Sequence, residues 1–172
     1  MEALGTPAIN TRILPKSSES MSIRIETKTP SDLYSELYPR ICSDSEERIV
    51  FLRGWKMETK ESLIDECSAS LQFPPLRAEN WDALSEDLFS LEWICKRHKI
   101  LVILETEKVL QQADDRDRLV FFRILLDAPA EHEVEWSRAN QKGELEIILQ
   151  CDQQYSGQVE QLLRSAKAGQ DE

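Results

Sequence analysis

Three short runs of apolar residues place the strongest constraint on the fold of this chain. They lie within residues 48–54, 100–105 and 145–150, and the first of them ends in a glycine turn. A continuous apolar run of this length is typical of a strand that is buried on both faces, as in a parallel sheet. Because helical patterns separate the runs, the sequence predicts an α/β fold, with a small three-stranded parallel sheet packed with helices.

The segments between these strands carry apolar residues at helical spacing. We expect helices over 29–41, 59–70 and 118–127, and a last helix from Ser156 or Gly157. Pro129 is expected to close the third helix, because proline inside a helix removes a hydrogen bond and clashes with the preceding turn. The alternating residues 23–25 could form a further short strand, and 107–112 a helical turn, whereas the structure of 130–142 is left open.

Charge and composition exclude several classes of protein. The net charge of −11 argues against direct binding of nucleic acid through its phosphates and suits a basic partner. No apolar run approaches the roughly 20 residues needed to span a bilayer, and no secretory signal pattern is present, so we expect a cytoplasmic protein without a membrane partner. The four cysteines lie far apart, which indicates free, mostly buried thiols rather than metal ligands.

The sequence shows no recognisable reaction centre, since Asp82 and Glu86 could act as an acid and a base but no oxyanion site or metal site accompanies them. With five glycines, the chain has neither a phosphate-binding loop motif nor a dinucleotide-binding motif. His98 and His132 each stand without a second histidine at metal-ligand spacing. We therefore predict no enzyme activity, no catalytic residues, no metal site and no cofactor.

The segment from Leu71 to Trp93 stands out, since a proline-containing loop leads into a short acidic helix that begins at the predicted N-cap Asn80. From Glu79 to Glu92 this segment has no basic residue and five acidic ones, which are Glu79, Asp82, Glu86, Asp87 and Glu92. Asp82 and Glu86 are one helical turn apart, on the side opposite the apolar residues of the helix. This pattern has two interpretations: a solvated helix face, or a negative projection that enters a basic cleft such as the phosphate-binding site of an enzyme.

The order of these elements, together with specific residues, resembles the barstar family of intracellular ribonuclease inhibitors. Leu71-x-x-Pro74 followed by E-N-x-D-A-L-x-E-x-L over 79–88 is similar to the family signature, and the predicted strands and the Phe122-Arg123 pair follow in the family's order. The resemblance implies a barstar-like domain over 48–151. Residues 1–22 would then be a flexible tail, 23–47 an N-terminal extension and 152–172 a C-terminal helix and tail, with Met1 and Met21 both possible starts.

The resemblance also implies a function. In that family the loop and the following helix plug a ribonuclease active site, so this chain would be an inhibitor or immunity protein for a basic nuclease toxin. By position, Glu86 takes the place of the key acid, Asp82 that of a second contacting acid, and Asn80 caps the helix. The expected partner-binding residues are Leu76, Arg77, Glu79, Asn80, Asp82, Ser85, Glu86 and Ser90.

The chain departs from the family pattern around this acid. Leu76, Arg77 and Ser85 stand where the type member has aromatic residues, and Ile124 stands where it has a contacting glutamate. Residues 128–142 resemble an insertion. These changes suggest a nuclease toxin other than barnase. The alternative is an interaction or scaffold module of the same fold that binds another basic protein; the toxin's substrate, RNA or DNA, and the oligomeric state stay open.

Overall fold

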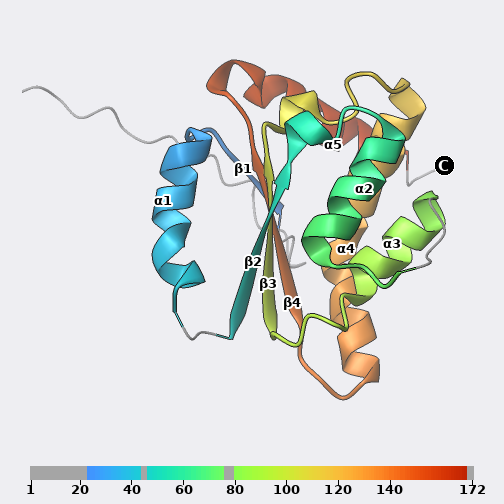
Figure 1. The fold of residues 1–172 in the computed structure, drawn as a ribbon. Coiled ribbons are helices and arrows are strands. Elements are labelled where there is room, and N and C mark those ends of the chain that lie inside the picture. Colours follow the sequence, from blue (N-terminus) through green and yellow to red (C-terminus); the bar gives the residue numbers. More distant parts are fainter. Residues whose placement is uncertain (1–22, 44–45, 76–79, 170–172) are drawn as a thin grey trace, which may run out of the picture.

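The protein is built on one parallel sheet, seen here in a computed structural model that describes residues 23–43, 46–75 and 80–169. The strands are β1 (Ile23–Glu26), β2 (Glu47–Arg53), β3 (His98–Leu104) and β4 (Glu144–Gln150). Their order is β1-β4-β3-β2, and every neighbouring pair is parallel (Figure 1). The predicted α/β class and parallel sheet are confirmed. The sheet has one strand more than predicted, because residues 23–26 pair with β4 at its edge.

Helices cover both faces of this sheet. They are α1 (Pro30–Ile41), α2 (Lys60–Leu71), α3 (Trp81–Ser90), α4 (Asp115–Arg138) and α5 (Ser156–Ala168). Figure 1 shows α1 on one face and α2, α3 and α4 on the other. Helix α5 packs on α4, where Arg123 Nε donates to the carbonyl of Ala166 over 3.4 Å. Single 3-10 turns follow three of the strands: η1 (Gly54–Lys56), η2 (Thr106–Lys108) and η3 (Gln153–Tyr155).

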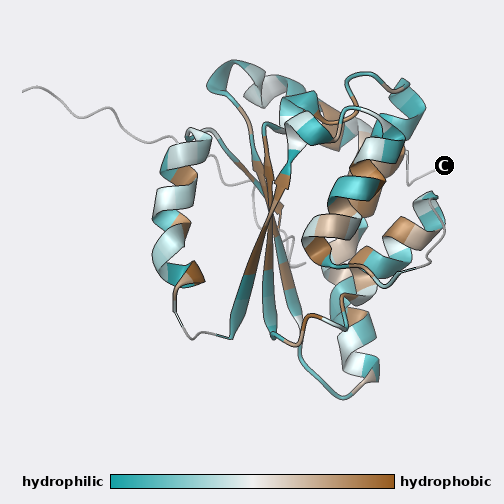
Figure 2. Cartoon of the chain, in the orientation of Figure 1, coloured by the Kyte–Doolittle hydropathy of each residue, from teal (hydrophilic) through white to brown (hydrophobic). Residues whose placement is uncertain are grey.

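The core lies on both sides of the sheet, as the continuous apolar runs predict. Successive side chains of a strand point to opposite faces. In β3, Leu101 and Ile103 join the larger cluster under α2 and α4, and Ile100 and Val102 join a smaller cluster under α1. All four side chains are almost completely buried. Figure 2 shows the same pattern, with hydrophobic colour along the strands and on helix surfaces turned toward the sheet.

Helix α4 is longer than predicted. The expectation that Pro129 closes this helix is wrong, since α4 runs without a break to Arg138. Ala128 and Pro129 are both buried, and His132, one turn further on, is fully buried against α3. Packing on both sides of the proline therefore offsets the loss of its hydrogen bond, and the ambiguous residues 130–138 become the last turns of α4.

The remaining sequence expectations have mixed outcomes. The cysteines in the structure are free, but only Cys67 and Cys151 are buried, while Cys42 and Cys95 are exposed. Burial raises the pKa of the Cys67 thiol, and it raises the pKa of Cys151 to about 11. Within the described ranges no group of acidic, histidine and cysteine side chains is arranged to hold a metal ion. None of the helices described is both long and apolar enough to cross a membrane.

Candidate functional site

Helix α3 starts at the N-cap that the sequence predicts. Asn80 Oδ1 accepts a hydrogen bond from the backbone N–H of Ala83 over 2.9 Å, which satisfies one of the free donors of the first turn. Asp82 lies in this first turn, where the positive end of the helix dipole favours an acid. The candidate residues Leu76, Arg77 and Glu79 precede the helix and lie outside the described residues.

The outer face of α3 carries the two carboxylates that the sequence singled out. Asp82 and Glu86 are exposed one turn apart, and Ser85 and Ser90 on the same helix are partly exposed. The inner face consists of Leu84, Leu88 and the C-cap Leu91, which are all buried. The geometry therefore brings these four candidate residues onto one helix, with both acids on its solvent side.

One acid of the predicted cluster does not belong to this surface. Asp87 is only 1% exposed, because it follows Leu84 by three positions and precedes Leu91 by four, and so points to the inner side of the helix. Glu92 is exposed but lies beyond the C-cap. The accessible negative charge of α3 is therefore centred on Asp82 and Glu86.

A further acid lies beside the start of α3, and sequence reasoning missed it. Trp81 Nε1 donates to Asp117 Oδ1 over 2.8 Å, which ties the first residue of α3 to the first turn of α4. Asp114 caps α4 by accepting from the N–H of Asp117 over 2.7 Å. Trp81 and Asp117 are 36 positions apart. No local pattern predicts such a contact, which exists only once the two helices pack.

Comparison with known proteins agrees with this geometry. The family model Barstar (barnase inhibitor) matches residues 47–158, which is more than half of the chain. The chain belongs to the barstar family. A comparison with curated proteins gave no match.

Barstar-family membership settles several predictions. It implies an inhibitor of barnase-like ribonucleases, and it confirms that the chain is not an enzyme, since barstars inhibit without catalysing a reaction. The match begins one residue before the predicted domain and ends inside α5, so it includes β2, β3 and β4 but not β1 or α1. The strand and helix on the N-terminal side therefore lie outside the matched residues.

The structure also explains one departure from the barstar pattern. Ile124, which the resemblance places where the type member has a contacting glutamate, is only 8% exposed and belongs to the core cluster. A side chain in that position cannot reach a partner protein.

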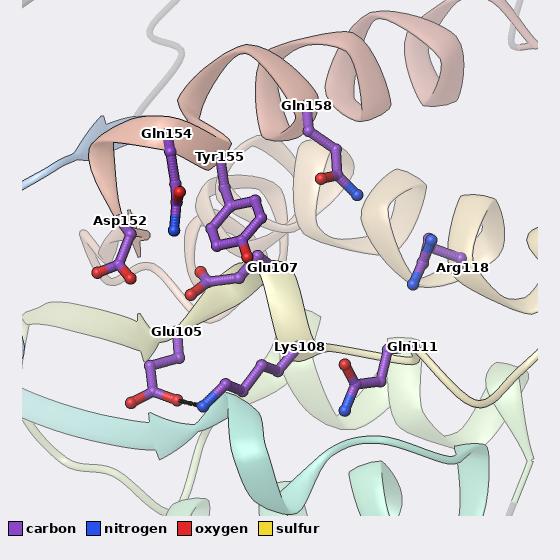
Figure 3. Close-up of a pocket in the computed structure, with 9 residues that line it drawn as sticks. All are labelled: Glu105, Glu107, Lys108, Gln111, Arg118, Asp152, Gln154, Tyr155 and Gln158. Carbon is purple, nitrogen blue, oxygen red and sulfur yellow. Dashed lines mark ion pairs between the residues drawn. The ribbon is translucent and has the colours of Figure 1, made fainter.

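A polar hollow of about 400 Å³ lies elsewhere, at the carboxyl ends of β3 and β4. Figure 3 shows its lining, which carries charges of both signs and includes an ion pair between Lys108 and Glu105. The lining residues are Glu105, Glu107, Lys108, Gln111, Arg118, Asp152, Gln154, Tyr155 and Gln158. None of them belongs to α3, so this hollow is separate from the acidic helix surface.

Within this hollow, the ionised carboxylate of Glu107 is expected to lower the free energy of unfolding at neutral pH. Burial, with the nearby charges of Asp152 and Glu105, raises the pKa of Glu107 above its ordinary value of 4.5. A carboxyl whose pKa is raised on folding favours the protonated form, so its ionisation costs stability once the pH exceeds both pKa values. Glu107→Gln should therefore raise the urea midpoint at pH 7, and the gain should shrink as the pH falls toward about 4.

The matched control for this prediction is Glu133→Gln, which neutralises an exposed glutamate on α4. It should change the midpoint little at either pH, because an exposed carboxylate keeps its water of hydration. A Glu107→Gln gain of the same size at pH 4 and pH 7 would show that ionisation is not the cause.

Proposed function

We propose that this chain inhibits a barnase-like ribonuclease toxin by inserting the loop after α2 and the outer face of α3 into the active site of the enzyme. Glu86 would occupy the position of a substrate phosphate, with Asp82 as a second contact. The observation that carries the proposal is the exposure of both carboxylates on one face of α3, a helix whose start is capped and tied to α4.

The chemistry of the target supports this assignment. An enzyme that cleaves a phosphodiester bond binds phosphate through basic side chains, and these side chains attract carboxylates for the same reason. A rigid helix holds its carboxylates in place before binding, so less conformational entropy is lost when the complex forms. The producing cell needs such an inhibitor where its own RNA is, and we therefore place the protein in the cytoplasm as an immunity protein.

A titration of barnase-like ribonucleases in an RNA-cleavage assay tests the proposal. The panel should include secreted ribonucleases whose genes adjoin the gene for this chain, and close relatives of those enzymes. At least one of them should lose its activity at about one equivalent of inhibitor. If no ribonuclease of the panel is inhibited while the protein binds another basic protein, the chain is a scaffold module of the same fold.

Barnase itself, included in that panel, is expected to be inhibited more weakly. Leu76, Arg77 and Ser85 stand in place of aromatic residues of the type member, and aromatic residues are the side chains that contribute most at such interfaces. The inhibition constant for barnase should therefore exceed that for the cognate enzyme by at least roughly tenfold, since tenfold corresponds to about 1.4 kcal/mol and one lost aromatic hot spot costs about 2 kcal/mol or more. Equal inhibition of both enzymes would contradict this prediction.

Association with a basic ribonuclease should depend strongly on salt. The chain carries a net charge of −11, and Asp82 and Glu86 contribute to it at the proposed contact. Salt screens such charges over about 10 Å at 0.1 M, so the association rate should fall by roughly tenfold or more between low and high salt. The dissociation rate should change little, because it depends on contacts already formed. Stopped-flow mixing measures both rates, and a salt-insensitive association rate would mean that the acidic face is only a solvated surface.

A further inference from the structure

The C-terminal end of α3 is held by side chains that the family comparison does not explain. His132 of α4 has its Nδ1 2.8 Å from the carbonyl oxygen of Phe89. Trp136, one turn further along α4, donates from Nε1 to the carbonyl oxygen of Ser90 over 3.0 Å. The last carbonyls of a helix lack partners within the helix, so these two bonds satisfy acceptors that would otherwise need water.

A buried lysine joins the two side chains. Lys99 of β3 is only 2% exposed, and its Nζ lies 3.3 Å from His132 Nε2 and 3.5 Å from the centre of the Trp136 ring. The same Nζ donates to the carbonyl of Lys96 over 2.8 Å. The ammonium group lies over the face of the indole ring, whose π electrons attract it.

The directions of the hydrogen bonds in this cluster are consistent with one another. A carbonyl can only accept, so His132 Nδ1 carries the proton toward Phe89, and its unprotonated Nε2 accepts from the ammonium of Lys99. Burial lowers the pKa of Lys99 to about 8, and burial together with the charge of Lys99 lowers the pKa of His132 to about 4. At neutral pH the lysine is therefore charged and the histidine neutral, as the geometry requires.

The neighbouring chain fits this arrangement closely. A Cβ added to Gly143, which directly precedes β4, would lie 2.5 Å from Trp136 Cγ, so the indole ring packs directly on the backbone there. Helix α4 thus holds α3 at both ends, through Asp117 at Trp81 and through His132 and Trp136 at the last two carbonyls. Figure 1 shows α3 lying against α4.

We propose that Lys99, His132 and Trp136, together called the α3 latch, are positioning residues that hold α3 in the orientation in which Asp82 and Glu86 meet the ribonuclease. The effect of the latch on ribonuclease binding rests on the proposed function, whereas its effect on α3 in the free protein does not. Holding both ends of a short helix restricts its tilt. A tilt would displace the carboxylates of Glu86 and Asp82, which lie about one and two turns before the C-terminal end of α3. The part of α4 that follows Pro129 thereby acquires a role in recognition that its sequence does not reveal.

Hydrogen exchange of the free protein tests the latch without any partner. Trp136→Phe keeps an aromatic ring beside Lys99 but removes the donor to Ser90, so the amides of Leu88 to Leu91 should exchange roughly fivefold faster, as expected for one lost hydrogen bond. Trp93→Phe is the matched control, since it removes the same indole donor from the carbonyl of Leu71 in α2. The control should leave exchange in the last turn of α3 unchanged.

A second pair of variants separates positioning from general loss of packing. His132→Leu removes both hydrogen bonds of the ring, whereas His132→Gln keeps one donor and one acceptor and should restore part of the protection. Against the ribonuclease most strongly inhibited in the panel, the leucine variant should dissociate faster than the glutamine variant, with similar association rates because neither changes the charge of the neutral side chain.

The outcomes are distinguishable. Unchanged exchange in Trp136→Phe and His132→Leu would overturn the latch. Faster exchange with unaltered dissociation rates, while Glu86 variants bind weakly, would overturn its positioning role and leave the proposed function intact. If Glu86 variants bind as well as the wild type, the proposed function fails, and the exchange data still decide whether the latch holds α3.

Discussion

Replacement of Glu86 by alanine is expected to remove most of the inhibition while the fold is retained. Glu86 is exposed on the outer face of α3, opposite the buried Leu84 and Leu88, and alanine is a good helix former. In the proposed complex the side chain faces basic groups that lose their water, and truncation would leave their charge unpaired. This costs about 2–5 kcal/mol at studied interfaces, the family's type pair among them, or roughly 30-fold to several thousand-fold in affinity.

The matched control is Glu92→Ala, which removes the same charge from an exposed residue beyond the C-cap of α3. The control should slow association slightly, because the total charge falls, but should leave the dissociation rate nearly unchanged. Glu86→Gln should lie between wild type and Glu86→Ala, since it keeps the shape of the side chain and loses the charge. Equal affinities for wild type and Glu86→Ala, measured by titration of the ribonuclease, would show that Glu86 does not take the place of the family's key acid.

Gly54→Ala is expected to be the most damaging small substitution in the described part of the chain. Gly54 directly follows β2, and an added Cβ would lie 2.3 Å from the carbonyl oxygen of Leu104 and 2.4 Å from that of Glu105. Both contacts are with backbone, which cannot rotate away as a side chain can. Overpacking of this kind costs typically 1–3 kcal/mol, and we expect at least the upper part of that range.

The strand end opposite Gly54 has little freedom to move. Glu105 adopts the left-handed conformation with φ of 49°, and its N–H donates to Gln150 Oε1 over 2.8 Å. Gln150 is fully buried and also donates to the carbonyl of Lys28. A shift of Glu105 away from a new methyl group would therefore break a buried hydrogen bond between two strand ends.

Gly157→Ala provides a control in which the same substitution should act in the opposite direction. A Cβ at Gly157, near the start of α5, would meet no atom within 4 Å. The substitution should stabilise the protein by roughly 0.5 kcal/mol, because alanine reduces the freedom of the unfolded chain and favours helix. Urea unfolding of both variants measures the two signs, and a stable Gly54→Ala protein would mean that β2 and β3 can separate at this end without cost.

The central part of the fold was predictable because the relevant signals are local. A run such as 100–105 cannot be exposed on either face without a large loss of hydrophobic stabilisation, so it must lie inside a covered sheet. Asn80 could be assigned as an N-cap because a cap acts on residues only two or three positions away. The same holds for the outward orientation of Asp82 and Glu86, which follows from helical spacing to Leu84 and Leu88.

The errors and omissions have a common cause, which is that they concern contacts between distant parts of the chain. Pro129 would end an isolated helix, but buried neighbours on both sides keep α4 intact to Arg138. Asp87 is the exception, because its inward direction follows from the local spacing to Leu84 and Leu91, whereas its charge alone suggested exposure.

The sequence by itself determined the α/β class, the parallel strands, the capped acidic helix and the resemblance to the barstar family. These signals are the spacing of apolar residues, helix caps and short motifs, and each acts over only a few residues. Only the tertiary structure decided that β1 joins the sheet beside β4, that Asp117 meets Trp81, and that His132 and Trp136 meet the end of α3. Each of these contacts joins residues more than thirty positions apart. Their stability comes from burying and pairing groups that no local pattern marks as neighbours.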